Sequence, residues 1–366
     1  MSSMNQNTVE VNLDEDSYQI DIGNNFLSKK DMEIFIGNRE VCLVYDENVP
    51  QSFITDVSNI FESISTEFCS VSLEATENKK SYESISSIHN LLIEEGYSRE
   101  CVLVALGGGI ISDLCGFAAA TYQRGVDFIL IPTTLLSQVD ASVGGKTAIN
   151  HPKGKNMIGS FHQPKKVFID TSFLTSLPER EVECGMVEMI KHGIIQDLSY
   201  FEWIEENIDS LKSLEDNNIA KAIRKSVEIK SSIVSQDEKE KGIRAILNFG
   251  HTFGHGIETI GNYKEFSHGE AVALGIMCAC ELSKEVEGFS NGEAQRIREI
   301  FLEVGVPLKL SKEIEPEDLY LAMQSDKKKE GKDLNFILLE RIGSAKKIKG
   351  INKEKVMDAI KKGLFS

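Results

Sequence analysis

Residues 101–113 read CVLVALGGGIISD, a short apolar run followed by three glycines and the first turn of a helix. A continuous apolar run of this length, bounded by glycines, predicts a strand that is buried on both faces. The glycines 107–109 then predict a tight turn whose backbone N–H groups, together with the dipole of the following helix, attract a phosphate. A plain tight turn is the alternative, but the position between strand and helix favours the phosphate site.

The alternation of strand and helix extends to both sides of this stretch. The predicted strands cover 41–45, 67–73, 101–106 and 128–131, and the predicted helices between them cover 50–64, 81–95 and 110–122. From about Leu177 the pattern predicts helices over 179–195, 220–238, 251–260, 269–287 and 292–304, a strand pair near 335–340 and 345–348, and a final helix. Alternation of this kind is typical of βαβ units. We therefore expect an α/β fold, with a nucleotide-binding domain over 1–176 and a mostly α-helical domain over 177–366.

The composition excludes several classes of protein. With 57 acidic and 40 basic residues the net charge is −17, which argues against binding to nucleic acids or to anionic membranes. No stretch approaches the ~18 apolar residues of a membrane span, and the N-terminus lacks the basic start and apolar run of a signal peptide. The seven cysteines contain no CxxC pair. Scattered thiols of this kind predict a cytoplasmic protein with reduced cysteines.

A basic block stands out against this acidic background. Between residues 121 and 156, glycines and short polar residues surround four basic residues, namely Arg124, Lys146, Lys153 and Lys155. A solvated loop is the alternative interpretation, but Leu135, Val139 and Val143 indicate that the segment is partly buried. We therefore expect a pocket for an anionic ligand here.

A helical segment further along carries an acid, an ammonium group and an imidazole on one face. Glu188, Lys191 and His192 are spaced i, i+3 and i+4. A surface salt-bridge cluster is the usual interpretation, but the neighbouring residues are apolar and predict a half-buried face. A buried carboxylate needs a partner, and a metal ion would serve.

Three of the seven histidines lie in residues 251–268. His251 and His255 are spaced i, i+4, so a helix places both on one face, as a metal site requires. Glycines at 250, 254 and 256 are unusual in a helix, because each costs roughly 1 kcal/mol relative to alanine. Something must approach this backbone closely.

Seven blocks of the sequence, taken together and in order, resemble the 3-dehydroquinate synthase family over roughly residues 40–345. The blocks are GGGIISDLCGFAAATYQRG, IPTTLLSQVDASVGGKTAIN, GKNMIGSFHQP, GMVEMIKHG, NFGHTFGHGIE, HGEAVALG and DKK. The resemblance implies an N-terminal Rossmann-like NAD-binding domain, a C-terminal mostly α-helical metal-binding domain and a homodimer. It also implies a small-molecule substrate, 3-deoxy-D-arabino-heptulosonate 7-phosphate, which is converted to 3-dehydroquinate and phosphate in the shikimate pathway.

The resemblance further implies a tightly bound NAD and a divalent ion, Zn²⁺ or Co²⁺. The implied metal ligands are Glu188, His251 and His268, which leaves His255 beside the substrate phosphate. The implied NAD contacts are Asp46, Glu77, Lys80, Gly107, Gly108, Gly109, Ile110, Ile111, Asp113, Thr133, Thr134, Lys146, Lys155, Phe173, Leu174, Thr175 and Ser176. The residues implied around the substrate are Asp140, Lys146, Asn156, Lys191, Lys230, Arg244, Asn248 and Lys328, and Arg124 is implied to reach the phosphate pocket of the partner subunit.

In the reaction cycle that the resemblance implies, C5 is oxidised, phosphate is eliminated, C5 is reduced, and the opened ring closes by aldol addition. Two departures from the family pattern are Glu74-Ala-Thr-Glu77, where Pro-x-Gly-Glu is usual, and His192, where tyrosine is frequent. Three alternatives are another sugar phosphate cyclase, a metal-dependent polyol dehydrogenase that yields net NADH, and a non-catalytic relative. The phosphate-binding residues argue against the dehydrogenase, and Lys146 and Arg244 favour a substrate with a carboxylate.

Overall fold

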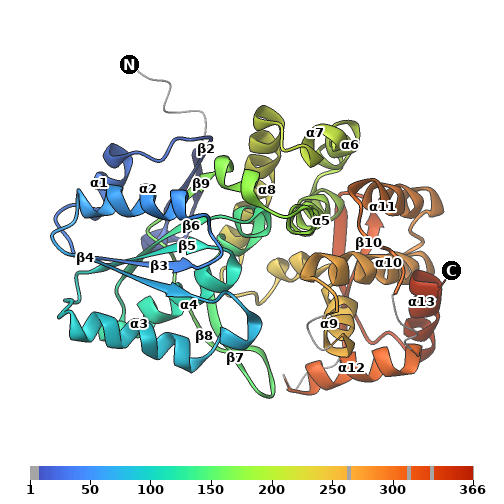
Figure 1. Cartoon of the computed structure of the whole chain (residues 1–366). Coiled ribbons are helices and arrows are strands. Elements are labelled where there is room, and N and C mark those ends of the chain that lie inside the picture. Colours follow the sequence, from blue (N-terminus) through green and yellow to red (C-terminus); the bar gives the residue numbers. More distant parts are fainter. Residues whose placement is uncertain (1–7, 262–264, 311–314, 330–333, 366) are drawn as a thin grey trace. The chain divides into compact units, whose positions relative to one another are not determined.

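The computed structural model describes residues 8–261, 265–310, 315–329 and 334–365, without the side chains of residues 325–329 (Figure 1). The chain forms two compact units. The N-terminal unit comprises Met1–Pro178 and Ile219–Lys239, and the C-terminal unit comprises Glu179–Asn218 and Glu240–Ser366. Within the described ranges, no helix is both long enough and apolar enough to cross a membrane.

A seven-stranded sheet forms the centre of the N-terminal unit. Its strands, in spatial order, are β1 (Thr8–Val11), β2 (Tyr18–Gly23), β9 (Lys166–Asp170), β6 (Asp127–Pro132), β5 (Val102–Gly107), β3 (Val41–Asp46) and β4 (Phe68–Leu73). Strand β1 is antiparallel to β2, and every other neighbouring pair is parallel. The four strands predicted from the sequence are confirmed as β3 to β6, and the expected α/β class with them. Strands β1, β2 and β9 were not predicted.

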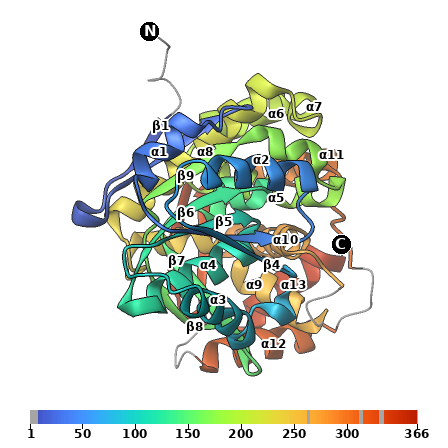
Figure 2. The same cartoon turned by 60° about the vertical axis from the view of Figure 1, so that its left-hand side comes forward.

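Helices cover both faces of this sheet. In Figures 1 and 2, α1 (Lys29–Ile36) and α2 (Gln51–Glu62) lie above the sheet, while α3 (Tyr82–Glu94) and α4 (Gly109–Thr121) lie below it. The apolar faces of α1 and α2 pack on β3 and β5, and Phe61 is fully buried among the strand residues. All six residues of β5 are buried. A strand covered by helices on both faces explains why the run that begins at Cys101 contains no polar residue.

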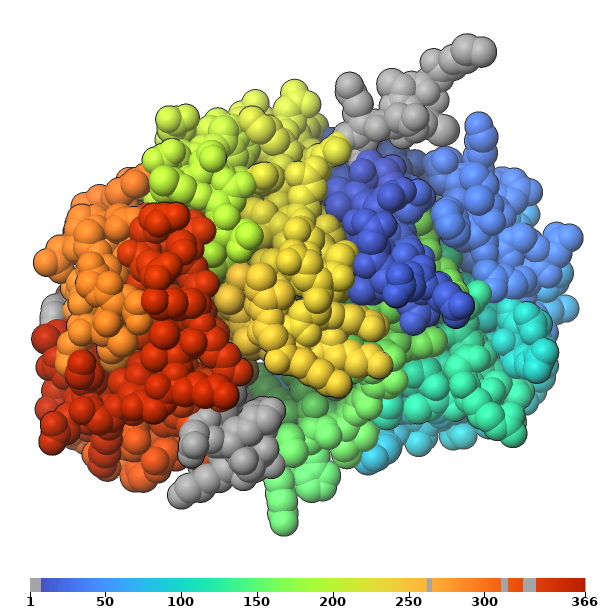
Figure 3. Space-filling view, turned by 180° about the vertical axis from the view of Figure 1, so that it is seen from behind, coloured from blue at the N-terminus to red at the C-terminus, as the bar shows by residue number. Residues whose placement is uncertain are grey.

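A hairpin extends from the same unit. Strands β7 (Lys146–His151) and β8 (Gly154–Phe161) pair antiparallel, and the pairing is irregular between Ile149 and His151. The tip of the hairpin, light green in Figure 3, projects from the surface.

The C-terminal unit is mostly helical, as predicted. Its elements are α5 (Glu179–Gln196), α6 (Leu198–Glu206), α7 (Ile208–Lys212), α9 (His251–Ile260), α10 (His268–Glu287), α11 (Asn291–Val304), α12 (Pro316–Lys329), the antiparallel pair β10 (Asn335–Arg341) and β11 (Ser344–Lys349), and α13 (Lys353–Phe365). Helix α10 packs on α5, α9, α13 and β10. Most of α8 (Asp216–Gln236) belongs to the N-terminal unit.

The glycines around His251 are explained by helix packing. A Cβ on Gly275 of α10 would lie 2.2 Å from the carbonyl oxygen of Gly250, and one on Gly254 would lie 3.1 Å from the carbonyl oxygen of Ala271. Gly256 faces α12 instead, where a Cβ would lie 2.8 Å from the side chain of Leu319. The close approach that the sequence predicted is therefore made by helices α10 and α12.

Candidate functional site

In the N-terminal unit, the carboxyl ends of four neighbouring parallel strands carry the residues predicted to bind NAD. Strands β3, β5, β6 and β9 end at Asp46, Gly107, Pro132 and Asp170. The predicted residues follow directly: Asp46 itself, Gly107 to Asp113, Thr133 and Thr134, and Phe173 to Ser176. In open α/β sheets, ligands bind outside this edge. The structure therefore brings four separate stretches of the sequence to one edge of the sheet.

The glycine turn connects β5 to α4, as the sequence predicted. Gly108 is the N-cap of α4, and no described side chain caps the helix or places an acid in its first turn. The first N–H groups of α4 are therefore not used by a cap. A Cβ on Gly107 would lie 2.7 Å from Ile111, and one on Gly109 would lie 3.2 Å from Ala141, so packing alone disfavours larger residues. This turn has the features of an anion-binding helix start.

A polar cluster lies beside the turn. The Nζ of Lys80, a residue that is only 5% exposed, forms an ion pair with Asp113 and donates to Oδ1 of Asn156 at 2.5 Å. Burial raises the pKa of Asp113, and the adjacent Lys80 ammonium partly offsets the rise. Asp113 is therefore a partner of Lys80 and does not cap the helix. On the other side of the cluster, Lys155 lies 3.4 Å from the carboxylate of Glu77.

The remaining predicted NAD contacts differ in what they can offer a ligand. Phe173 and Leu174 are buried, and Phe173 packs edge-on against Phe53 with ring centroids 4.8 Å apart. Thr175 and Ser176 are exposed on the same turn. Only the latter two side chains, or the backbone of the turn, are available to a ligand.

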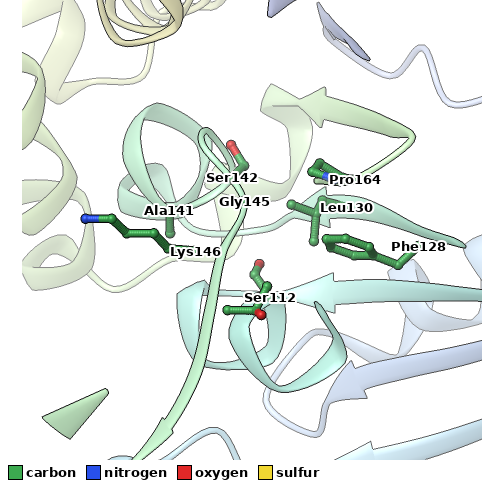
Figure 4. Close-up of a pocket in the computed structure, with 9 residues that line it drawn as sticks. Ser112, Phe128, Leu130, Ala141, Ser142, Gly145, Lys146 and Pro164 are labelled. Atoms are coloured by element: carbon green, nitrogen blue, oxygen red, sulfur yellow. The ribbon is translucent and has the colours of Figure 1, made fainter. Parts of the chain in front are cut away.

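Two predicted substrate residues meet within the N-terminal unit. Lys230, buried on α8, donates to the carbonyl oxygen of Asp140 at 2.5 Å and to its carboxylate at 2.7 Å. Lys146 is exposed at the start of β7, beside a small hollow of about 10 Å³ that Ser112 and Phe128 help to line. In Figure 4 the ammonium group of Lys146 points away from Phe128, so it does not reach into this hollow.

Arg124 lies in a strained turn at the end of α4. Gln123 has φ 48°, Arg124 has φ 72°, and Gly125 follows with φ 123°. Two consecutive non-glycine residues in the left-handed region are uncommon. Arg124 is exposed, and among the described residues its side chain has no hydrogen bond or ion pair. The turn thus presents an arginine to the outside of the unit.

The C-terminal unit brings Glu188, His251 and His268 together from helices α5, α9 and α10. Both histidines are the first residues of their helices, and the Nε2 atom of each lies 3.7 Å from Oε1 of Glu188. One ligand atom from each residue lies within 4.8 Å of the others. His255 is not part of this group. Its ring makes an edge contact with His251, at 5.5 Å between centroids.

The donor set fits a divalent metal ion. Glu188 is fully buried, and within the described chain neither of its carboxylate oxygens has a hydrogen-bond partner, although Lys191 forms an ion pair with Oε2. A separation of 3.7 Å from each imidazole nitrogen is too long for a hydrogen bond. One carboxylate and two imidazoles leave coordination positions open, as a catalytic site requires.

Contacts behind the two histidines orient them toward Glu188. The Nδ1 atom of His251 lies 3.2 Å from the carbonyl oxygen of Phe249, and that of His268 lies 3.4 Å from Oε1 of the buried Glu258. When Nδ1 donates its hydrogen to such an acceptor, Nε2 keeps the lone pair that binds a metal. Glu258 was not among the residues predicted from the sequence. Its signal was the spacing i+7 from His251, which puts both residues on one face of α9.

The charges in this cluster are strongly coupled. Burial alone would raise the pKa of the Glu188 carboxyl, but Lys191 and the two histidines outweigh burial and hold that pKa well below its usual range. Burial, followed by the Lys191 ammonium, lowers the pKa of His251 to about 3. Burial opposes the charged form of His268, yet the nearby carboxylates of Glu188 and Glu258 raise its pKa to about 10. At pH 7 Glu188 is thus an anion and His251 is neutral, the forms that bind metals, whereas His268 is protonated in the absence of an ion and must release a proton when a metal binds.

Arg244 and Asn248 lie on the same short helical turn, Ile243–Asn248, within the C-terminal unit. Arg244 is buried, and the amide group of Asn248 contacts the carboxylate of Glu240, which the sequence analysis did not identify. Lys191 is also buried. The side chain of Lys328, predicted to contact phosphate, lies outside the described residues.

Comparisons with known proteins give a consistent result. The family models described as 3-dehydroquinate synthase N-terminal and C-terminal match residues 70–184 and 185–329. The 3-dehydroquinate synthase of Bordetella pertussis is 44% identical over 337 residues, which cover 92% of this chain and 94% of that protein.

The similar solved structures share the fold at lower sequence identity. One is 2-deoxy-scyllo-inosose synthase complexed with carbaglucose-6-phosphate, NAD⁺ and Co²⁺, which is 24% identical with a TM-score of 0.89 and covers 98% of this chain and 100% of its own. Another is 2-epi-5-epi-valiolone synthase from Streptomyces hygroscopicus with NAD⁺ and Zn²⁺ bound, which is 24% identical with a TM-score of 0.87 and covers 95% and 97%.

Proposed function

The chain belongs to the 3-dehydroquinate synthase family, and from this premise we propose how its residues carry out the family's reaction. It is an enzyme of this family, a cyclase that eliminates phosphate. The observation that carries the proposal is that His251 and His268 converge on the buried carboxylate of Glu188. The proposed substrate is 3-deoxy-D-arabino-heptulosonate 7-phosphate, and the proposed products are 3-dehydroquinate and phosphate.

Glu188, His251 and His268 would hold the divalent ion, Zn²⁺ or Co²⁺. When bound, such an ion lowers the pKa of a coordinated hydroxyl and polarises a coordinated carbonyl. The protein contributes the orientation of the ligands, because Phe249 and Glu258 fix the two imidazoles from behind. Lys191 adds a buried positive charge next to Glu188. That charge also stabilises negative charge that develops on a bound substrate.

The carboxyl edge of the parallel sheet would hold NAD. NAD, when bound, supplies the reversible oxidation and reduction of the substrate carbon. The start of α4 at Gly108 suits the pyrophosphate, and Asp46 at the end of β3 suits a ribose hydroxyl. Lys80 and Glu77 would complete the pocket, since the polar cluster already holds both side chains in place.

Charged side chains would recognise the two ends of the substrate. Lys146 and Arg244 suit its carboxylate, and His255, Asn156 and Arg124 suit its phosphate, together with Lys328. Loss of phosphate requires removal of a proton next to the oxidised carbon, and the departing phosphate can accept that proton. The residues of the chain therefore act chiefly by positioning the substrate and stabilising its charge.

We also propose a cytoplasmic homodimer. All seven cysteines are free thiols in the structure, as a reducing compartment requires. The exposed Arg124 on its strained turn supports the dimer, because the family relationship implies that this arginine enters the phosphate pocket of a second copy.

Substrate selectivity tests the proposal against the other sugar phosphate cyclases. If Lys146 and Arg244 bind a carboxylate, a heptulose 7-phosphate without that carboxylate will react at least about a hundredfold more slowly, because its charge-assisted hydrogen bonds to the two cations are then lost. The two substrates are compared by the rate of phosphate release. Equal kcat/KM values for the two substrates would contradict the proposed substrate.

A further inference from the structure

Asn150, to which the sequence analysis gave no role, lies at the centre of the polar cluster in the N-terminal unit. It makes four hydrogen bonds with three described residues, Glu77 and Lys80 from one turn and Asn156 from β8. Its backbone N–H donates to the carbonyl oxygen of Lys80 at 2.7 Å. Its side-chain Nδ2 donates to the carbonyl oxygen of Glu77 at 3.0 Å and to the Glu77 carboxylate at 2.6 Å. Its Oδ1 accepts from the backbone N–H of Asn156 at 2.9 Å. The nitrogen and the oxygen of this side-chain amide thus bind different residues.

The side-chain oxygen of Asn150 binds a residue with an unusual backbone conformation. Asn156 has φ 54°, in the left-handed region, and lies on β8 opposite the irregular pairing between Ile149 and His151. A strand irregularity of this kind changes the direction in which a side chain points. The Oδ1 of Asn150 binds the N–H of Asn156, and Lys80 binds its side-chain oxygen. These two contacts hold Asn156 in a conformation that costs free energy on its own.

The side-chain nitrogen of Asn150 binds the part of the cluster that is assigned to the NAD pocket. One oxygen of the Glu77 carboxylate accepts from Asn150, and the other lies 3.4 Å from Nζ of Lys155. Glu77, Lys80 and Lys155 are residues assigned above to the NAD pocket, whereas Asn156 is assigned to the phosphate of the substrate.

We propose that Asn150 is a positioning residue that serves both the NAD pocket and the phosphate pocket. Its amide group fixes the Glu77 carboxylate with the nitrogen and the Asn156 backbone with the oxygen. The inference rests on the proposed function, because the roles of Glu77 and Asn156 come from it.

Two substitutions distinguish this role from a purely structural role in the hairpin. Asn150→Ala removes both ends of the amide. Asn150→Asp keeps an oxygen that can accept from the N–H of Asn156 but places a carboxylate against that of Glu77, where like charges repel. His151→Ala is the matched control, because His151 lies in the same hairpin and, within the described ranges, its side chain hydrogen-bonds only to the N–H of Lys153 in the turn, at 3.1 Å.

The experiment measures two constants for each variant: the dissociation constant of NAD by calorimetry, and the inhibition constant of inorganic phosphate. Asn150→Ala will raise both constants by about tenfold, the change expected when a hydrogen bond to a charged or strained group is lost. Asn150→Asp will raise the dissociation constant of NAD by about tenfold. It will raise the inhibition constant of phosphate by less than about fivefold. His151→Ala will leave both constants unchanged.

Urea unfolding shows that each variant is folded under the conditions used. If Asn150→Ala does not fold, the unequal changes of the NAD and phosphate constants in Asn150→Asp alone decide whether the inference holds. The inference is overturned if a folded Asn150→Ala binds NAD and phosphate within twofold of the wild type. It is also overturned if Asn150→Asp weakens both ligands equally. Failure of the wild-type protein itself to bind NAD or phosphate would instead contradict the proposed function.

Discussion

The Nδ1 atom of His268 lies 3.4 Å from the carboxylate of Glu258, and the Nε2 atom on the opposite side of the same ring faces Glu188 at 3.7 Å. One imidazole thus connects two buried carboxylates that come from different helices. Such an arrangement fixes the tautomer and the orientation of a metal-binding histidine.

Glu258→Gln will therefore weaken metal binding without abolishing it. The loss will be about 10- to 100-fold in affinity, as is usual for a carboxylate that supports a metal-binding histidine. Competition with a chelator measures the affinity for Zn²⁺, and the visible absorption of bound Co²⁺ reports a change in ligand geometry. Glu281→Gln is the control, because Glu281 lies on α10 and pairs only with Lys284 among the contacts described here. Identical affinities for the two variants would exclude the role of Glu258.

His268→Ala and His255→Ala will have different effects, although both remove a histidine from the same region. His268→Ala will lose the metal, because it removes one of three ligands. His255→Ala will keep the metal and lose about 100-fold in rate, because a donor to a charged leaving group is typically worth that much. Metal analysis of the purified variants checks the first outcome, and phosphate release checks the second. Full metal occupancy in His268→Ala would refute the ligand assignment.

The fold itself was largely predictable, because strands and helices with buried faces have characteristic periodicities. The strands β3 to β6 and the main helices of the C-terminal unit appear in the sequence as short apolar runs and as helical repeats. Strands β1, β2 and β9 were missed. Strand β2 alternates buried and exposed residues over six positions, a weak pattern beside the stronger signals of the later strands.

The candidate site was harder to predict from local patterns. Helical spacing pairs His251 with His255, yet the ligand atoms that meet Glu188 come from His251 and His268, on two different helices. Only the family resemblance separated these possibilities, because the tertiary packing of α9 on α10 determines which residues converge. Glu258 had only a weak local signal, its spacing from His251, and Asn150 had none, because each acts on a residue outside its own helix or strand.

The packing of α9 on α10 can be tested by substituting its glycines. Gly254→Ala places a Cβ 3.1 Å from a backbone carbonyl oxygen and will destabilise the protein by about 1–3 kcal/mol, the usual effect of overpacking. Gly292→Ala is the control, because nothing lies within 4 Å of the added Cβ on α11. It will stabilise by about 0.4–1 kcal/mol through the unfolded state. Urea unfolding measures both changes. A stabilised Gly254→Ala protein would mean that the two helices are not in close contact.

Mixing two inactive variants tests whether Arg124 acts on a second copy of the chain. Arg124→Ala lacks the arginine, and His268→Ala lacks a metal ligand. In a mixed dimer, one site regains both groups if Arg124 crosses the subunit boundary. Random exchange will therefore restore about a quarter of the wild-type activity, since half of the dimers are mixed and each has one complete site. No recovery after subunit exchange, verified by mass, would place Arg124 in its own subunit's site.

The central claim is that the enzyme uses NAD as a catalyst and not as a consumed substrate. The most direct measurement is incubation of the protein with 3-deoxy-D-arabino-heptulosonate 7-phosphate, Zn²⁺ and substoichiometric NAD, with phosphate and NADH followed together. The account predicts many phosphates released per NAD and no accumulation of NADH. One NADH formed per substrate, with no phosphate released, would contradict it and indicate a polyol dehydrogenase.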